Sequence, residues 1–461
     1  MDERIRGPAS SATVAAVTRI AVLLEQCLAP VPGGTGRYSR ELAAALAQTA
    51  PAGYEVVGWV AWHREVAAAR VAGVSGPRRL PLPRRALVAA WQRQTGPTPR
   101  WADLVHAPTP LAPPRRGRPL VVTVHDTVPW THPDTLTARG AAWHRLVIGH
   151  AARYADRIVV PTHAVAADLA EHLKIAPDRL VIIGEGATAA LRPQPPDGQP
   201  VARQPAVGGP PAGQSRMEQP PAGQSRMEQP PAGQLSGGHP PAGELPMGRF
   251  PGDEVPVGQP LVDDIGWGQG SAGDKEVARR LGLPAGGYVL SLATLEPRKG
   301  LDVLLAAMAQ PAAPDLPLLV VGQSGWGGVD PMAEAARLGV PAGRVRVLGR
   351  LPDADLAVVL ARATALAAPS RAEGFGLPVL EAMAAGVPVI SSDAPALVEV
   401  GGGATLVVKR DDPAALAEAL AEIVTDDGLR AKLAAAGRQR ATVYTWEGAA
   451  RSLWEVYVDL C

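Results

Sequence analysis

Short apolar runs alternate with helix-like segments along most of the chain, on both sides of an unusual middle. The runs are rich in valine and leucine and begin at Thr18, Leu120, Arg157, Gly287, Leu316 and Arg344. Each is followed by a polar or glycine-containing turn and then by a segment with helical spacing. This alternation is typical of parallel sheets, because parallel strands are joined through crossover helices. The pattern predicts doubly wound α/β domains in both flanking parts of the chain.

The middle of the chain, from about 193 to 273, is instead rich in proline, glycine and glutamine. The sequence PPAGQSRMEQ occurs twice, at Pro210 and Pro220, and degenerate copies follow at Pro230 and Pro240. Paired prolines without an apolar face cannot bury a core, so we expect a disordered or polyproline-like linker. A long insertion between domains is thermodynamically tolerated. A segment that binds a partner is the alternative.

These patterns divide the chain into five parts. We expect a disordered N-terminal tail in 1–17, a first α/β domain in 18–192, the linker in 193–273, a second α/β domain in 274–440 and a closing helix in 441–461. A chain of 461 residues, 46% of them apolar, is long enough for two or three hydrophobic cores.

The most informative segment reads EGFGLPVLE and runs from Glu373 to Glu381. It follows an apolar run, and its Gly-Phe-Gly turn lets backbone N–H groups approach a ligand, while Pro378 suits the first turn of a helix. Glu373 is therefore expected on a loop and Glu381 inside the next helix. Hydrolytic carboxylates flank one glycosidic bond about 5–9 Å apart. A loop and a helix instead place the two carboxylates at different depths along one ligand, which fits recognition of hydroxyl groups better than hydrolysis. A loop-to-helix turn with a capping glutamate is the alternative.

This segment resembles the signature of the retaining glycosyltransferases of family 4, which have the GT-B fold, an α/β architecture of two Rossmann-like domains facing across a cleft. The resemblance implies that Glu373 contacts the transferred sugar and that Glu381 binds the nucleotide ribose. It also implies that the turn holds the sugar hydroxyls, through Gly374, Phe375, Gly376 and the adjoining Leu377. The C-terminal segment resembles the family's final helix, which crosses back to the first domain.

A glycine-rich turn follows the first apolar run. Gly33, Gly34 and Gly36 precede an Ala-rich helix that we expect to begin at Ser39, and a strand, a glycine loop and a helix N-terminus together form an anion site. The third glycine of a dinucleotide fingerprint is missing, because Ser39 stands in its place. The family resemblance places Gly34 against the donor diphosphate, with Gly36 beside it.

Two histidines end strand-like runs in the first domain. His125, in TVHDT, resembles the family's V-H-D strand end, where the histidine reaches the sugar or the acceptor, and Asp126 is its expected orienting neighbour. His106, in LVHAP, is the weaker candidate. A histidine near a strand end has a structural role in many proteins, which is the alternative for both.

Two cationic residues lie near the start of the second domain. Arg298 and Lys299 lie between a strand and a helix, where two positive charges can neutralise a departing diphosphate. They resemble the family's E-P-R-K-G segment, in which the lysine carries this role. Many members also have an arginine where this chain has Thr294. Arg298 either substitutes for that charge or is a surface residue flanking Lys299.

Two further positions follow later strand-like runs. The family resemblance places Gly322 and Arg350 near the nucleotide, the first for close backbone approach and the second for charge. A plain turn is the alternative for each.

Charge is divided unevenly between the halves. Residues 1–192 hold 23 Lys and Arg against 14 Asp and Glu, a net charge of +9, and the remainder holds 22 against 30. Such a surface can contact an anionic membrane or a phosphorylated acceptor, or be merely solvated. Nucleic acid is not expected as a partner, because aromatic residues are only 4% of the chain.

No signal for membrane crossing or export is visible in the sequence. No apolar stretch reaches about 18 residues, and the N-terminus lacks the apolar core of a signal peptide. We therefore expect a cytoplasmic protein, with peripheral attachment at the inner face of the membrane as an alternative. Cys27 and Cys461 lie far apart in the sequence and suggest neither a disulfide framework nor a metal site.

Taken together, the resemblance implies a retaining hexosyltransferase that moves a sugar from a nucleotide sugar to a hydroxyl of a glycan, lipid or small molecule. The sequence contains no D-x-D motif with metal-binding surroundings, so we expect the reaction to need no metal. The donor, of the GDP-mannose or UDP-glucose type, is a substrate, and no further cofactor is expected. One alternative is a GT-B enzyme that epimerises or phosphorolyses sugars. The other is a catalytically weak nucleotide-sugar-binding protein.

Overall fold

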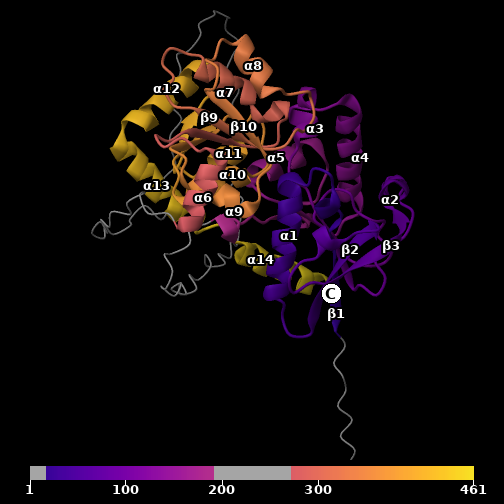
Figure 1. Ribbon diagram of the computed structural model, residues 1–461. Helices are drawn as coiled ribbons and strands as arrows, with labels where there is room; N and C mark the ends of the chain where they lie inside the picture. Colours follow the sequence, from indigo (N-terminus) through magenta and orange to yellow (C-terminus); the bar gives the residue numbers. More distant parts are fainter. Residues whose placement is uncertain (1–16, 192–270) are drawn as a thin grey trace, which may run out of the picture. The chain divides into compact units, whose positions relative to one another are not determined.

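The computed structural model describes residues 17–191 and 271–461. The predicted tail, except for its last residue, and nearly all of the predicted linker lie outside the described residues. Both described ranges belong to one compact unit. Figure 1 shows the order of the elements along the chain by colour.

The first range forms a sheet of seven parallel strands in the order β3-β2-β1-β4-β5-β6-β7. The strands are β1 Thr18–Leu23, β2 Tyr54–Trp62, β3 Ser75–Pro83, β4 Leu104–Ala107, β5 Leu120–Thr123, β6 Arg157–Val160 and β7 Leu180–Ile182. The first six follow the Rossmann order, in which the chain reverses direction across the sheet beside β1. Strands β4 and β5 are buried along their whole length, as expected when helices cover both faces.

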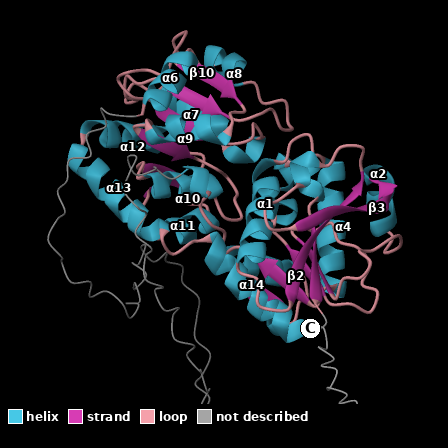
Figure 2. Ribbon diagram, turned by 60° about the horizontal axis from the view of Figure 1, so that its bottom comes forward, coloured by secondary structure: helices cyan, strands magenta, loops and turns pink. Residues whose placement is uncertain are grey.

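The second range repeats the same plan with six parallel strands in the order β10-β9-β8-β11-β12-β13. They are β8 Val289–Leu292, β9 Leu318–Val321, β10 Val345–Gly349, β11 Ala365–Ala368, β12 Val389–Ser392 and β13 Leu406–Val408. The predicted fold class, two Rossmann-like doubly wound domains, is confirmed. Figure 2 shows the two sets of strands in magenta with cyan helices around them.

Helices connect nearly all of these strands. In the first range they are α1 Gly33–Gln48, α2 Arg84–Trp91, α3 Val128–Thr131, α4 Ala138–Tyr154 and α5 His163–His172. In the second they are α6 Ala272–Leu281, α7 Leu301–Met308, α8 Pro331–Arg337, α9 Asp353–Ala361, α10 Leu377–Ala385, α11 Pro395–Gly401, α12 Pro413–Thr425, α13 Asp427–Ala441 and α14 Trp446–Leu460. Short 3-10 helices are η1 Glu25–Leu28, η2 Ala67–Ala69, η3 Pro133–Thr135, η4 Pro177–Arg179, η5 Ala189–Leu191 and η6 Pro297–Lys299.

The last helix, α14, packs against the first sheet's helix α1, and both figures show the two helices side by side. The indole of Trp454 donates a hydrogen bond of 3.2 Å to the carbonyl oxygen of Leu46. The phenol of Tyr457 lies 2.6 Å from Nδ1 of the buried His106 on β4. These contacts tie the end of the chain to the first domain through buried polar groups.

Helix α1 starts earlier than the sequence predicted. It begins at Gly33 rather than Ser39, so the three glycines lie in its first turn instead of in a flexible loop. Ser39 lies inside the helix and donates a hydrogen bond of 2.7 Å to the carbonyl oxygen of Thr35. A Cβ on Gly36 would lie 2.5 Å from the side chain of Pro32, which explains the glycine by close packing.

The second domain also begins slightly earlier than its predicted start at 274. Helix α6 starts at Ala272 and is stabilised by a capping box in which Ser271 and Asp274 exchange side-chain to backbone hydrogen bonds. Among residues 17–191 and 271–461, no helix is long and apolar enough to cross a membrane.

Candidate functional site

The candidate site is built at the carboxyl ends of parallel strands, where α/β folds hold their ligands. Glu373 follows β11, Lys299 ends the short helix η6 after β8, and His125 follows β5. The loop that carries Glu373 lies directly on the backbone of His125, since a Cβ on Gly374 would lie 1.7 Å from the carbonyl oxygen of His125. Three segments distant in sequence therefore meet at one place.

Glu373 is surrounded by cationic and hydroxyl groups. Its Oε1 lies 2.5 Å from the Lys299 ammonium and accepts a hydrogen bond of 2.9 Å from Ser370, while Oε2 lies 3.3 Å from the Arg298 guanidinium. Burial alone would raise the pKa of Glu373, but the Lys299 and Arg298 charges and the hydrogen bonds hold it below its ordinary value. Glu373 is therefore a carboxylate at neutral pH.

Arg298 is not a surface residue. Its side chain is only 16% exposed and its guanidinium lies 3.0 Å from Glu296 as well as near Glu373. Burial is the largest effect on Glu296 and raises its pKa, although the Arg298 charge opposes it. Within the described residues, Oε2 of Glu296 has no hydrogen-bond partner. The two carboxylates therefore hold the arginine head inside the site.

The glycine turn of α1 faces the second domain. A Cβ built on Gly33 would lie 4.0 Å from Oγ1 of Thr294, and one on Gly34 would lie 3.9 Å from the side chain of Leu377. The first turn of α1 thus approaches both the end of β8 and the start of α10. The role of Gly34 and Gly36 at a diphosphate stays a prediction.

His125 is held by Glu185 rather than by Asp126. Its Nε2 lies 2.8 Å from the carbonyl oxygen of Pro108 and its Nδ1 lies 3.4 Å from the carboxylate of Glu185. Burial would lower the pKa of His125, but Glu185 and the Pro108 carbonyl raise it above its ordinary value. Asp126 instead accepts a hydrogen bond of 3.3 Å from the backbone of Val128. The predicted role of Asp126 as the orienting partner was wrong.

His106, the weaker candidate, belongs to the core. It is fully buried, and burial lowers its pKa to about 3, so the ring is neutral. Its Nε2 lies 2.9 Å from Oγ1 of Thr123, and its Nδ1 contacts Tyr457. Both ring nitrogens have protein partners, which is the arrangement of a structural histidine.

Glu381 lies inside α10, as predicted, and is 3% exposed. Its Oε1 accepts a hydrogen bond of 2.7 Å from Arg37 and one of 3.1 Å from Thr188. Burial raises the pKa of Glu381, and the Arg37 charge opposes that shift. Both partners come from the first range of the chain.

The turn before α10 depends on its second glycine. Gly376 has a φ of +95°, and a Cβ there would lie 2.4 Å from the side chain of Leu397. The ring of Phe375 is buried and packs edge-on against Tyr444 at 5.3 Å, so it leaves only its backbone for a ligand. The carbonyl oxygen of Gly374 accepts a hydrogen bond of 3.0 Å from Thr162.

Gly322 and Arg350 have different surroundings. A Cβ on Gly322 would lie 1.8 Å from the carbonyl oxygen of Ala293, so strand-end packing alone requires glycine there. Arg350 is exposed, and within the described residues its side chain forms no hydrogen bond or ion pair. Their nucleotide contacts remain predictions.

Sequence reasoning missed the residues that hold the site residues in place. They are Arg37, Glu185, Thr188, Glu296 and Ser370. A signal existed for two of them, because Glu185 and Thr188 stand in the short glycine-containing segment GEGAT that follows β7. A carboxylate between glycines directly after a strand is a reasonable ligand or partner in an α/β fold.

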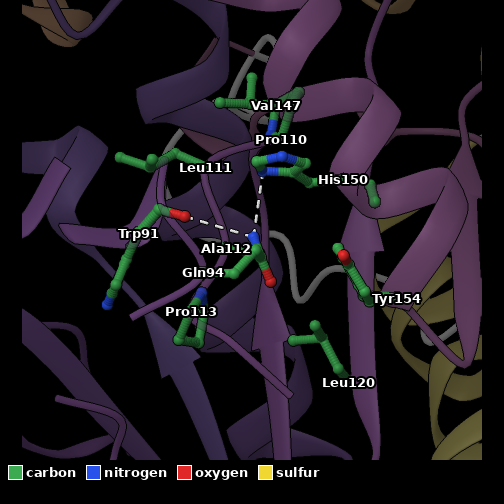
Figure 3. A pocket seen from close by; sticks show the side chains of 11 residues that line it. Trp91, Gln94, Pro110, Leu111, Ala112, Pro113, Leu120, Val147, His150 and Tyr154 are labelled. Carbon is green, nitrogen blue, oxygen red and sulfur yellow. Dashed lines mark hydrogen bonds between the residues drawn. The ribbon is translucent and has the colours of Figure 1, made fainter. Parts of the chain in front are cut away.

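A small cavity elsewhere in the first domain is too small for a substrate. It lies between α2, α4 and the segment before β5, has a volume of about 10 Å³ and is lined mostly by apolar side chains (Figure 3). Gln94 donates hydrogen bonds of 3.2 Å to the carbonyl oxygen of Trp91 and 3.0 Å to Nδ1 of His150. The space suffices for about one water molecule.

Comparison with known proteins identifies the class. The two Rossmann-like domains have the architecture of the GT-B fold. The description "Glycosyltransferase Family 4" matches residues 32–189, and "Glycosyl transferases group 1" matches residues 278–440. The chain belongs to this family of glycosyltransferases.

Curated relatives match about two fifths of the chain. The chain is 38% identical over 164 residues to the O-antigen chain mannosyltransferase B of Escherichia coli. This alignment covers 35% of this chain and 43% of that protein. It is 37% identical over 208 residues to the D-inositol 3-phosphate glycosyltransferase of Salinispora arenicola, covering 41% and 46%. The chain therefore spans less than half the length of these relatives.

A solved structure matches nearly the whole chain. The Anabaena HepE protein in complex with UDP and glucose aligns with a TM-score of 0.61 at 17% identity, covering 96% of this chain and all of that one. At this identity the similarity shows the fold alone, and it agrees with the two-domain architecture.

Proposed function

We propose that the protein transfers a hexose from a nucleotide sugar to an acceptor hydroxyl with retention of anomeric configuration. The observation that carries this proposal is the buried carboxylate of Glu373, held by Lys299 and Arg298 on a loop that lies against His125. Fixed charges around a shielded carboxylate are suited to orient a sugar and to stabilise a departing diphosphate.

In the proposed reaction, the bond between the anomeric carbon and the donor diphosphate breaks and a bond to the acceptor oxygen forms. The acceptor proton passes to an oxygen of the departing phosphate. Lys299 and Arg298 stabilise the charge on that diphosphate, together with the backbone of Gly34 at the N-terminus of α1. Glu373 and His125 orient the hexose, and Glu381 binds the ribose.

We propose that the reaction needs no metal and that Lys299 and Arg298, which pair with Glu373 and Glu296 in this structure, are the cations that meet the departing diphosphate. Mannose from a guanosine nucleotide is our first choice of donor, because the E. coli relative is named as a mannosyltransferase. Glucose from a uridine nucleotide is the second, and the HepE structure contains UDP and glucose. The donor is a substrate and no separate cofactor is proposed.

We also propose that the first domain contacts an anionic surface, such as a membrane or a phosphorylated acceptor. Trp62 and Trp101 are 51% and 66% exposed. The guanidinium of Arg78 lies 6.0 Å from the ring of Trp59 and 5.9 Å from that of Trp101. Exposed tryptophan beside arginine suits the interface of anionic headgroups. Co-sedimentation with phosphatidylglycerol vesicles, but not with phosphatidylcholine vesicles, supports the membrane, and loss of binding in Trp101→Ala locates the surface.

The transferase proposal is tested by screening nucleotide sugars for thermal stabilisation and nucleoside diphosphate release in the presence of EDTA. Glu373→Gln and Lys299→Met should each lower turnover by about 10²–10³-fold. Glu276→Gln, which alters an exposed pair with Arg279 on α6, is the matched control and should retain activity. The anomeric configuration of the product, determined by NMR, decides between retention and inversion.

The same screen separates the alternatives. Turnover without an acceptor alcohol would favour an epimerase or phosphorylase. Donor binding without any transfer would favour a nucleotide-sugar-binding protein. Activity that EDTA abolishes and magnesium restores would refute the metal-independent mechanism.

A further inference from the structure

Arg37 links the two domains at the predicted ribose site. It lies in the first turns of α1, and its two terminal nitrogens reach different acidic residues of the second domain. Nη1 donates a hydrogen bond of 2.7 Å to Glu381 on α10, and Nη2 donates one of 2.7 Å to Asp353 at the start of α9. A single guanidinium therefore spans two helices of the opposite sheet.

The contact leaves Glu381 with one occupied oxygen and one available oxygen. Both Arg37 and Thr188 donate to Oε1. Within the described residues, Oε2 accepts no hydrogen bond, and it is not among the fully buried polar atoms that lack a partner. A carboxylate fixed through one oxygen presents the other in a defined direction, which suits a hydroxyl donor on a ligand.

We infer that Arg37 is a positioning residue for nucleotide binding: it fixes Glu381 so that the free carboxylate oxygen faces the ribose hydroxyls. This inference rests on the proposed function, in which Glu381 binds the ribose. It adds that the ribose site is complete only when the first domain supplies Arg37 and Thr188. Nucleotide recognition thereby depends on contact between the two domains.

Arginine is the residue type that this geometry requires. The planar guanidinium can donate to two separate carboxylates at once in fixed directions, whereas the lysine ammonium is a point charge on a flexible stem. Asp353 is half exposed, while Glu381 is almost fully buried. The hydrogen bond to Asp353 therefore holds the Arg37 guanidinium at the exposed edge of the site, and the hydrogen bond to Glu381 fixes the buried carboxylate.

The test compares binding of GDP and UDP with binding of their 2′,3′-dideoxy counterparts, which lack both ribose hydroxyls. The wild type should bind one of the two diphosphates at least about tenfold more tightly than its dideoxy form, as expected for hydrogen bonds to a charged group. In Arg37→Met this ratio should fall toward one. Arg37→Lys should give an intermediate ratio, and Asp353→Asn a smaller reduction.

Arg40→Met is the matched control, because Arg40 lies on the same helix and, within residues 17–191 and 271–461, its side chain donates only to the backbone of Ala68. It should keep the wild-type ratio. An unchanged ratio in Arg37→Met, with Glu381→Gln abolishing discrimination, would overturn the inference and leave the proposed function standing. A wild type that binds neither diphosphate would refute the proposed function itself. If Arg37→Met fails to fold, the same affinity ratio of diphosphate to dideoxy form is measured in Arg37→Lys and Asp353→Asn, and an unchanged ratio in both would overturn the inference.

Discussion

Tyr457 provides a direct test of how α14 is fixed to the first domain. The residue is fully buried, and its phenol oxygen lies 2.6 Å from Nδ1 of His106. His106 is also fully buried, and its other nitrogen is taken by Thr123. Tyr457→Phe removes one oxygen atom and leaves Nδ1 without its partner. This holds for either tautomer of the neutral ring.

The expected cost follows from this geometry. A buried polar atom that loses its partner costs about 1–3 kcal/mol, because the group stays desolvated without a hydrogen bond. We therefore expect the free energy of unfolding to fall by that amount in Tyr457→Phe. The measurement is urea unfolding followed by tryptophan fluorescence, and Trp454 on the same helix reports on its environment.

Two further variants make this prediction decisive. Tyr154→Phe removes the same atom from a phenol that forms no hydrogen bond within the described residues, and it should change stability by less than about 0.5 kcal/mol. The double variant Tyr457→Phe with His106→Leu removes both partners and should cost less than the sum of the single changes. Equal effects for Tyr457→Phe and Tyr154→Phe, or additive effects in the double variant, would refute the reasoning.

Three other predictions concern the site and its surroundings. Glu185→Gln removes a charge that raises the pKa of His125, so the pKa of His125 measured by NMR should fall; an unmoved pKa would contradict this. Gly376→Ala should destabilise by more than Gly403→Ala, since both have positive φ but only the first meets a side chain; equal melting temperatures would argue against the clash. Burial lowers the pKa of His106 to about 3, so the contribution of this residue to stability is fully present above pH 6.5. The free energy of unfolding should fall by about 1.4 kcal/mol per pH unit as the pH drops from 6.5 toward 3. Urea unfolding at a series of pH values measures this slope, and His106→Leu should lack it.

The fold could be predicted because its signal is local. Strands such as β5 and β9 are buried along their whole length, so each appears in the sequence as an unbroken apolar run. The positions of Glu373 on a loop and Glu381 in a helix followed from the Gly-Phe-Gly turn and Pro378 in the same way. The start of α1 was missed because glycine usually weakens helices, whereas here Gly36 is required by contact with Pro32.

The partners of the site residues could not be predicted, because they lie far away in the sequence. Glu185 is 60 residues from His125, and Arg37 is 344 residues from Glu381. Neither pair leaves a periodic pattern. For His125 the adjacent Asp126 was the natural expectation, but its carboxylate is directed to the backbone of the following helix. Such assignments depend on the order of strands in the sheet and on contact between domains.

Thr294 stands where many members of the family have an arginine. Thr294 faces the first turn of α1, since a Cβ built on Gly33 would lie 4.0 Å from its Oγ1. The positive charge is instead present on Arg298, whose head is held inside the site by Glu296 and Glu373. Because electrostatic stabilisation depends on where a charge lies rather than on which position in the sequence carries it, Arg298 with Lys299 can meet the same diphosphate. We therefore keep Arg298 and Lys299 as the proposed cations for the diphosphate despite the departure at Thr294.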